Sequence, residues 1–168
     1  VGAAGLAAVT SGAQNTAVGF QAGDAIADGS YNVAVGANAG GGISSGAQNV
    51  AIGQGTMNAT LTTNLNTAVG DSAMAAVTSG DSNSAVGASS MTLLVGGQYN
   101  TSIGRNSLAT STAADRATCI GYAACGSGVV VETAYPTAVG FAALDALVGG
   151  LGNTAVGYYA AAALVGGD

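Results

Sequence analysis

The side chains that could carry acid–base or metal chemistry in this chain of 168 residues are its carboxylates, since the sequence has no His. Catalytic carboxylate pairs stand roughly 5 to 10 Å apart. Asp81 and Asp115 lie two repeats of 17 residues apart, which corresponds to about 10 Å if the repeats stack like strands. A calcium-binding repeat, however, needs an acid in every repeat, and no acidic position recurs here. We therefore expect no catalytic residue, no metal site and no cofactor, and we interpret the acids as solvated loop residues: Asp24, Asp28, Asp71, Asp81, Asp115, Glu132, Asp145 and Asp168.

The composition excludes several classes of function. Lys is absent as well as His, so Schiff-base chemistry, a P-loop and a His-based triad are excluded. Two Arg and a formal net charge of −6 leave no basic surface for nucleic acid. No apolar run is long enough to span a bilayer, so we expect no membrane contact by this segment. Low charge and a mean hydropathy of +0.47 argue against intrinsic disorder.

Most aromatic residues fall in two columns of the last five repeats, one directly after a recurrent Gly and one directly before a recurrent Asn. Both Arg residues fall in the same columns, so stacked rings and cation–π pairs between neighbouring repeats are expected. We favour a stabilising ladder, and the alternative is an exposed stripe that stacks on the sugar rings of a glycan. The possible glycan-contact residues are Arg105, Tyr122, Phe141 and Tyr158 in the first column and Tyr99, Arg116 and Tyr135 in the second.

The two cysteines, Cys119 and Cys125, replace small or apolar residues of the repeat. We expect them to point to different faces across a Gly corner, which favours free buried thiols. A contact of Cys119 with its own copies at an oligomer axis and an intrachain disulfide are the alternatives. The redox compartment is therefore not decided by the cysteines.

The elements that must position these residues follow from a repeat that runs through the chain. The motif Asn-Thr-Ala-Val-Gly and its variants recur, and their glycines are spaced by 17, with one step of 19 between Gly121 and Gly140. We place the two-residue insertion at residues 129–135, within 126–136. Because both ends fall in mid-repeat, we expect residues 1–168 to form one repetitive segment, a fragment of a longer fibre. The motif glycines are Gly2, Gly19, Gly36, Gly53, Gly70, Gly87, Gly104, Gly121, Gly140 and Gly157.

The three residues before each Gly predict a short strand with two different faces. The first and third are mostly Thr, Val or Ile, which favours buried strand positions facing the core. The middle residue is always small and must face the opposite way. We interpret this column as a flat stripe against another chain, and the alternative is a tight spot within one coil. The predicted subunit-interface column is Ala17, Ala34, Ala51, Ala68, Ala85, Ser102, Cys119, Ala138 and Ala155.

A 17-residue unit with so little structure cannot bury its apolar residues alone, but copies stacked on one another can. We therefore predict an all-β fold, a parallel β-solenoid of ten coils about 4.8 Å apart. A column of Asn supports the stacking, because identical amides can hydrogen-bond along the axis. The column lapses at Ala117 and Pro136, on either side of the insertion. The predicted axial ladder is Asn15, Asn32, Asn49, Asn66, Asn83, Asn100 and Asn153.

The repeat also resembles a known family, most closely at residues 32–36 (Asn-Val-Ala-Val-Gly) and 49–53 (Asn-Val-Ala-Ile-Gly). It is similar to the head repeat of trimeric autotransporter adhesins and to repeats of phage-type tail-fibre proteins. The resemblance covers all ten repeats and implies a left-handed β-roll with three chains to a head and the Ala position toward neighbouring chains. The repeat here is longer than the usual head repeat, so we expect a longer outer loop.

This resemblance implies a structural extracellular fibre segment, on a bacterial cell surface or a virion tail fibre, that mediates adhesion or attachment to a host glycan or protein receptor. The expected partner is therefore the chain itself, as a homotrimer, besides that receptor. The alternative is a self-assembling extracellular filament with a purely structural role. An ice-binding surface is a further alternative that would need outward-facing Thr rows, and the predicted inward direction of the Thr column argues against it.

Overall fold

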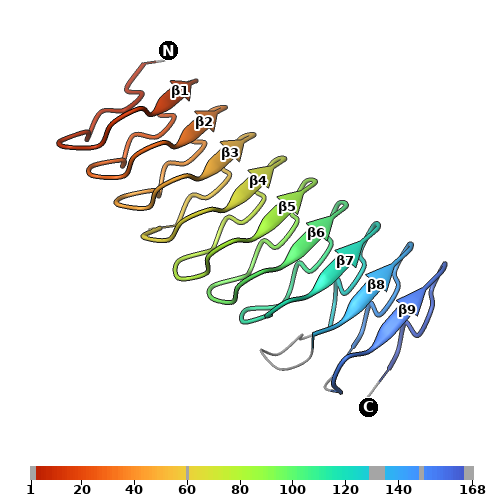
Figure 1. Cartoon of the computed structure of the whole chain (residues 1–168). Coiled ribbons are helices and arrows are strands. Elements are labelled where there is room, and N and C mark those ends of the chain that lie inside the picture. The colour runs from red at the N-terminus through yellow and green to blue at the C-terminus, as the bar shows by residue number, and fades with distance from the viewer. Residues whose placement is uncertain (1–2, 60, 129–134, 148–149, 165–168) are drawn as a thin grey trace.

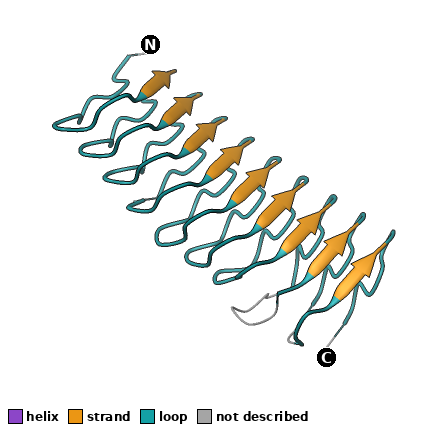
Figure 2. Cartoon of the chain, in the orientation of Figure 1, coloured by secondary structure: helices purple, strands orange, loops and turns teal. Residues whose placement is uncertain are grey.

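The computed structural model describes residues 3–59, 61–128, 135–147 and 150–164. The chain forms a parallel β-solenoid of about eight turns with coils of about 17 residues, and its two ends lie at opposite ends of the stack (Figure 1). Each coil contributes one strand of three residues, and turns and loops make up the remainder (Figure 2). The strands are β1 (Thr16–Val18), β2 (Val33–Val35), β3 (Val50–Ile52), β4 (Thr67–Val69), β5 (Ser84–Val86), β6 (Thr101–Ile103), β7 (Thr118–Ile120), β8 (Thr137–Val139) and β9 (Thr154–Val156).

All nine strands form a single parallel sheet in chain order. Every residue of a strand pairs with its counterpart one repeat later, as Thr67 does with Ser84. Between β7 and β8 the partners are Thr118 and Thr137, so the two-residue insertion lies between these strands and leaves the register of the motif intact. Most of the predicted insertion segment, residues 129–134, lies outside the described residues.

The strands face the opposite way from the sequence prediction. The middle residue of each strand points into the coil and is buried from β2 to β9, whereas the flanking β-branched residues are half-buried or exposed. The prediction of inward Thr and Val columns is therefore wrong. The physical reason is the width of the coil: a Cβ built on Gly40, in the turn facing the strand, would lie 3.2 Å from the Ala34 Cβ atom. Only a small strand residue leaves room for a long side chain from that turn.

The core is filled from the turns rather than from the strands. Two apolar columns, four and seven residues after the motif Gly, supply all of the largest fully buried side chains except Leu61. Burying a side chain of this size contributes about 1.5 to 3 kcal/mol relative to leaving it exposed. The large buried members are Met57, Met74, Met91, Leu108 and Leu144 in one column, which also holds the buried Cys125, and Ile26, Ile43, Val77, Leu94 and Leu147 in the other.

The motif Gly marks the corner at which each strand ends. Gly87 has φ +129°, and a Cβ added to it would lie 2.6 Å from the Gly104 carbonyl group of the next coil. In a second Gly column, a Cβ on Gly29 would overlap the Gly46 carbonyl oxygen, although Gly29 has no positive φ. Gly97 of the same column combines such an overlap with φ +104°. Neighbouring coils therefore approach closely at both corners, which favours glycine, although Thr63 and Ala114 occupy the second column in two coils.

The two cysteines form an intrachain disulfide, with Cα atoms 6.1 Å apart. Cys119 is the middle residue of β7, and Cys125 stands in the facing Met/Leu column, so both side chains point into the same coil interior. The expectations of free thiols and of side chains on different faces are both wrong. Both expectations depend on the small column lying outside the coil, whereas Cys119 of that column points inward.

Candidate functional site

The carboxylates stabilise the loops instead of converging on one another. Asp81 Oδ1 accepts the backbone N–H of Asn64 at 2.7 Å. Asp115 Oδ1 accepts the backbone N–H of Gln98 at 2.6 Å, so each acid satisfies a donor of the preceding coil. Among the described residues no group of three or more His, Cys, Asp or Glu could hold a metal ion.

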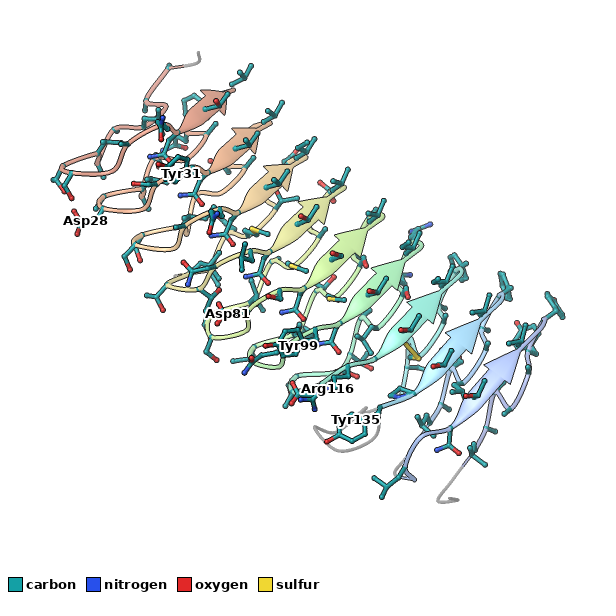
Figure 3. The ribbon with its side chains drawn as sticks, viewed as in Figure 1. Asp28, Tyr31, Asp81, Tyr99, Arg116 and Tyr135 are labelled. Atoms are coloured by element: carbon teal, nitrogen blue, oxygen red, sulfur yellow. A yellow bond between two sulfur atoms is a disulfide. The ribbon has the colours of Figure 1, made fainter. Side chains whose placement is uncertain are left out.

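Asp28 belongs to a small exposed hydroxyl–carboxylate cluster near the start of the rod (Figure 3). Its Oδ1 accepts hydrogen bonds from the Thr10 hydroxyl at 2.7 Å and the Ser11 hydroxyl at 2.8 Å. These two bonds, that of Thr10 first, lower the pKa of the Asp28 carboxyl below its ordinary value of 3.8. The cluster joins the loops of two neighbouring coils and brings no second acid to this carboxylate.

The Asn column forms a ladder of hydrogen bonds along the axis. Asn83 is typical: its Oδ1 accepts the backbone N–H of Asn100 at 3.0 Å and the Asn100 Nδ2 at 2.9 Å. Its own Nδ2 donates to the Asn66 Oδ1 at 3.2 Å and to the Gly97 carbonyl at 2.9 Å. Each such side chain therefore ties three consecutive coils together. The ladder is continuous through Asn15, Asn32, Asn49, Asn66, Asn83 and Asn100.

The two lapses in this ladder compensate each other. The Asn100 Oδ1 still accepts the backbone N–H of Ala117. Ala117 offers no acceptor to the next coil, and Pro136, which stands there, has no N–H that needs one. Asn153 is left without a ladder neighbour, and its Nδ2 is buried with no partner among the described residues.

The predicted interface column lies inside the coil, where no second chain can reach it. Ala34, Ala51, Ala68 and Ala85 are completely buried within the single chain, as are Ser102, Cys119 and Ala138. Ala155 is almost as buried, and Ala17 in the first strand is half-buried. The assignment of these residues to a subunit interface is therefore wrong, and the alternative of a tight spot within the coil describes them.

The outer face of the sheet carries the surface that the sequence reasoning assigned to the core. Its first row combines Thr with Val and Ser, and its second row is entirely Val or Ile. Because the strands are parallel and in register, each row runs straight along the rod. A continuous apolar row on a surface commonly marks an interaction site. The rows are Thr16, Val33, Val50, Thr67, Ser84, Thr101, Thr118, Thr137 and Thr154, and Val18, Val35, Ile52, Val69, Val86, Ile103, Ile120, Val139 and Val156.

The first aromatic column forms a stack at the corner after the strands. Ring centroids of Tyr122 and Phe141 are 5.0 Å apart, and those of Phe141 and Tyr158 are 5.3 Å apart. Tyr159, which sequence reasoning missed, packs its ring edge-on to that of Tyr158. Arg105 forms no cation–π contact with this stack. Because the rings cover one another's faces, the middle of the stack has no free face for a sugar ring.

The second aromatic column has a different arrangement. The Arg116 guanidinium lies over two rings, 5.8 Å from the centroid of Tyr99 and 5.5 Å from that of Tyr135. The three residues come from successive coils on one corner of the rod (Figure 3), and all three are exposed. Each has positive φ, of 60°, 51° and 44° in chain order, a conformation that the sequence did not reveal because none of them is Gly.

The described residues include no helix that could span a membrane. Comparison with protein-family models, with curated proteins and with solved structures gives no match for this chain.

Proposed function

We propose that the chain is a structural segment of an extracellular fibre whose rods associate through the outer face of the sheet. The observation that carries the proposal is the unbroken Val/Ile row on that face. In keeping with the adhesin-head resemblance, the proposed assembly is a homotrimer of left-handed coils, projecting from a bacterial cell or a phage tail and attaching to a surface receptor. The chain has no catalytic task in this proposal.

The outer face suits association with a copy of itself. Val18, Val86 and Val156 are 48%, 39% and 69% exposed, so a partner could cover much of each side chain. Removing about half of such a side chain from water contributes on the order of 1 kcal/mol per strand. Two copies of the rod have the same spacing between strands. Each side chain of a row on one copy can therefore lie opposite a side chain of the same row on the other.

The disulfide supports the extracellular part of the proposal. Cys119 and Cys125 are paired, and disulfides persist mainly in oxidising compartments such as the cell exterior. The low content of charged residues, 6% of the chain, also suits a rod much of whose surface is covered by copies.

Two other functions use the same face. Open-ended lateral pairing of rods would give a purely structural filament. The outward Thr residues favour ice binding as a second candidate, because six of the nine residues of that row are Thr and neither outer row contains a charged residue. The Thr column points outward rather than inward, but the row beside it is Val or Ile instead of a second Thr row.

The test is the mass of the protein in solution by light scattering, for the native chain and for Val86→Glu. A native mass of three chains, reduced to one by this substitution, is the expected result, because a buried carboxylate at the interface lacks a partner. Gln54→Glu adds the same charge at an exposed corner and is the matched control. Ala85→Glu would not serve, since Ala85 is buried within the coil and its replacement would disturb the fold.

A monomeric native chain contradicts the fibre proposal, and open-ended polymers favour the filament. A monomer that also shapes ice crystals and lowers their growth temperature, with loss of both effects in Thr101→Leu, establishes the second candidate.

A further inference from the structure

We propose that Tyr99, Arg116 and Tyr135 form a binding site for the carboxylate of an acidic sugar, such as a uronic acid. This inference rests on the receptor-attachment part of the proposed function and names the class of receptor. It concerns the corner of the rod directly before the Asn ladder (Figure 3), two residues ahead of strands β6, β7 and β8.

The guanidinium of Arg116 lies between rings of the coil before it and the coil after it. Their centroids are 5.8 and 5.5 Å from the Cζ atom, within cation–π range, and the side chain is exposed, so its N–H donors are accessible to a ligand. The edge of the plane is the part that binds a carboxylate through two parallel hydrogen bonds. The rings on either side offer phenol hydroxyls for the hydroxyls of a sugar.

Hydrogen bonds to the preceding coil fix the backbone of Tyr99 and Arg116 before any ligand arrives. The Arg116 N–H donates to the Gln98 carbonyl at 2.9 Å, and the Tyr99 N–H donates to the Asp81 carbonyl at 3.3 Å. Asn100, directly after Tyr99, is fixed in the buried ladder. A backbone that is already fixed loses little conformational entropy on binding, which favours affinity.

The cation has no counter-ion among the described residues. No ion pair or side-chain hydrogen bond of Arg116 is formed there, and the neighbouring Asp115 uses its Oδ1 for the Gln98 N–H. In a chain with a net charge of −6, general attraction cannot collect anions, so an acidic ligand must be recognised by this local geometry. The other ring column lacks a cation in contact and offers no equivalent site.

The experiment is titration calorimetry of the native chain with three probes: an oligogalacturonate, a neutral galactan oligomer of the same length, and a sulfated galactan oligomer. We expect the oligogalacturonate to bind at least tenfold more tightly than the other two. Arg116→Lys keeps the charge but loses the planar fork, and it should weaken binding of the uronate about tenfold or more. Tyr135→Leu should also weaken it, whereas Arg105→Gln, the matched control, should leave it unchanged.

Absence of binding by the native chain, equal binding of the neutral oligomer, or an equal loss in Arg105→Gln would overturn the site. Tighter binding of the sulfated oligomer would overturn the assignment to a carboxylate. The mass by light scattering is recorded for every variant, and none of these substitutions touches the outer sheet face. A monomeric chain that still binds the uronate would leave this site standing while contradicting the fibre.

Discussion

At the scale of single residues, the Asn column stabilises the stacking of coils by hydrogen bonds to their buried backbone groups. Each amide accepts a backbone N–H of the next coil and donates to a carbonyl there, so it satisfies groups that a buried corner would otherwise leave unpaired. The column was predictable from the sequence because identical residues recur at a fixed spacing. The compensation at Ala117 and Pro136 was not, since it depends on which backbone group each side chain faces.

This compensation predicts strong coupling between the two positions. Pro136→Asn alone adds a backbone N–H opposite the Ala117 methyl, and Ala117→Asn alone adds an acceptor opposite a proline. An unpaired buried polar group costs about 1 to 3 kcal/mol. Each single variant should therefore be less stable than the native chain, or at best about as stable. The double variant completes the ladder to Asn153 and should be more stable than the sum of the singles predicts by about 1 to 2 kcal/mol.

Urea unfolding of the four proteins in the cycle measures the coupling. The loss of proline rigidity is common to the variants that carry Pro136→Asn and therefore cancels. The control is a second cycle that combines Pro136→Asn with Gln54→Ala. Gln54 is exposed, and Ala37 and Ala88 occupy the same column in other coils. The changes in the free energy of unfolding should be additive in this cycle. Additivity in the Ala117 cycle as well would mean that the ladder does not act through these backbone groups.

At the scale of the coil, the sequence predicted the solenoid but reversed its strand. The repeat length and the recurrent glycines indicate that coils stack, and both can be read directly from the sequence. The direction of the side chains depends on how wide the coil is, which the spacing does not reveal. Met91 and Leu108 fill the interior from the turn, so the strand can contribute only Ala85 or Ser102 there. The β-branched residues then keep their strand preference on the outside, and the pairing of Cys119 with Cys125 follows from the same geometry.

The corners of the coil should differ sharply in what they tolerate. Gly87→Ala places a Cβ 2.6 Å from the Gly104 carbonyl group at φ +129°, and should destabilise the protein by more than about 3 kcal/mol or prevent folding. Gly55 also has positive φ, but the nearest atom to an added Cβ is the Ser72 Oγ at 3.8 Å. Gly55→Asn, which copies Asn38 of the same column, should change stability by less than about 1 kcal/mol, because Asn tolerates this conformation.

Thermal unfolding followed by circular dichroism compares the two glycine variants directly. Equal effects of Gly87→Ala and Gly55→Asn would contradict the view that closeness of neighbouring coils, rather than positive φ alone, selects glycine at the end of each strand.

At the scale of the whole molecule, each strand in the described part of the chain pairs only with the strands of the coils before and after it, as in repeat proteins generally. Each coil depends on the one before and the one after. Stability should therefore change in steps of one coil. The tolerated insertion between β7 and β8 agrees with this, because the strands on either side remain in register.

Deletion of one whole coil should preserve the fold at a small cost. Removing residues 67–83 joins Asn66 to Ser84, so the ladder continues from Asn66 to Asn100 and every later residue keeps its column. At about 0.1 kcal/mol per residue, the free energy of unfolding should fall by about 1 to 3 kcal/mol.

Removing only residues 67–75 takes away fewer residues but leaves a remnant too short for a coil. The remnant must form an extra loop that exposes Val77 and adds about 2 kcal/mol of closure cost. The shorter deletion should therefore be the less stable of the two in urea unfolding. If stability instead declines in proportion to the number of residues removed, the coil is not the unit that carries the stability of the rod.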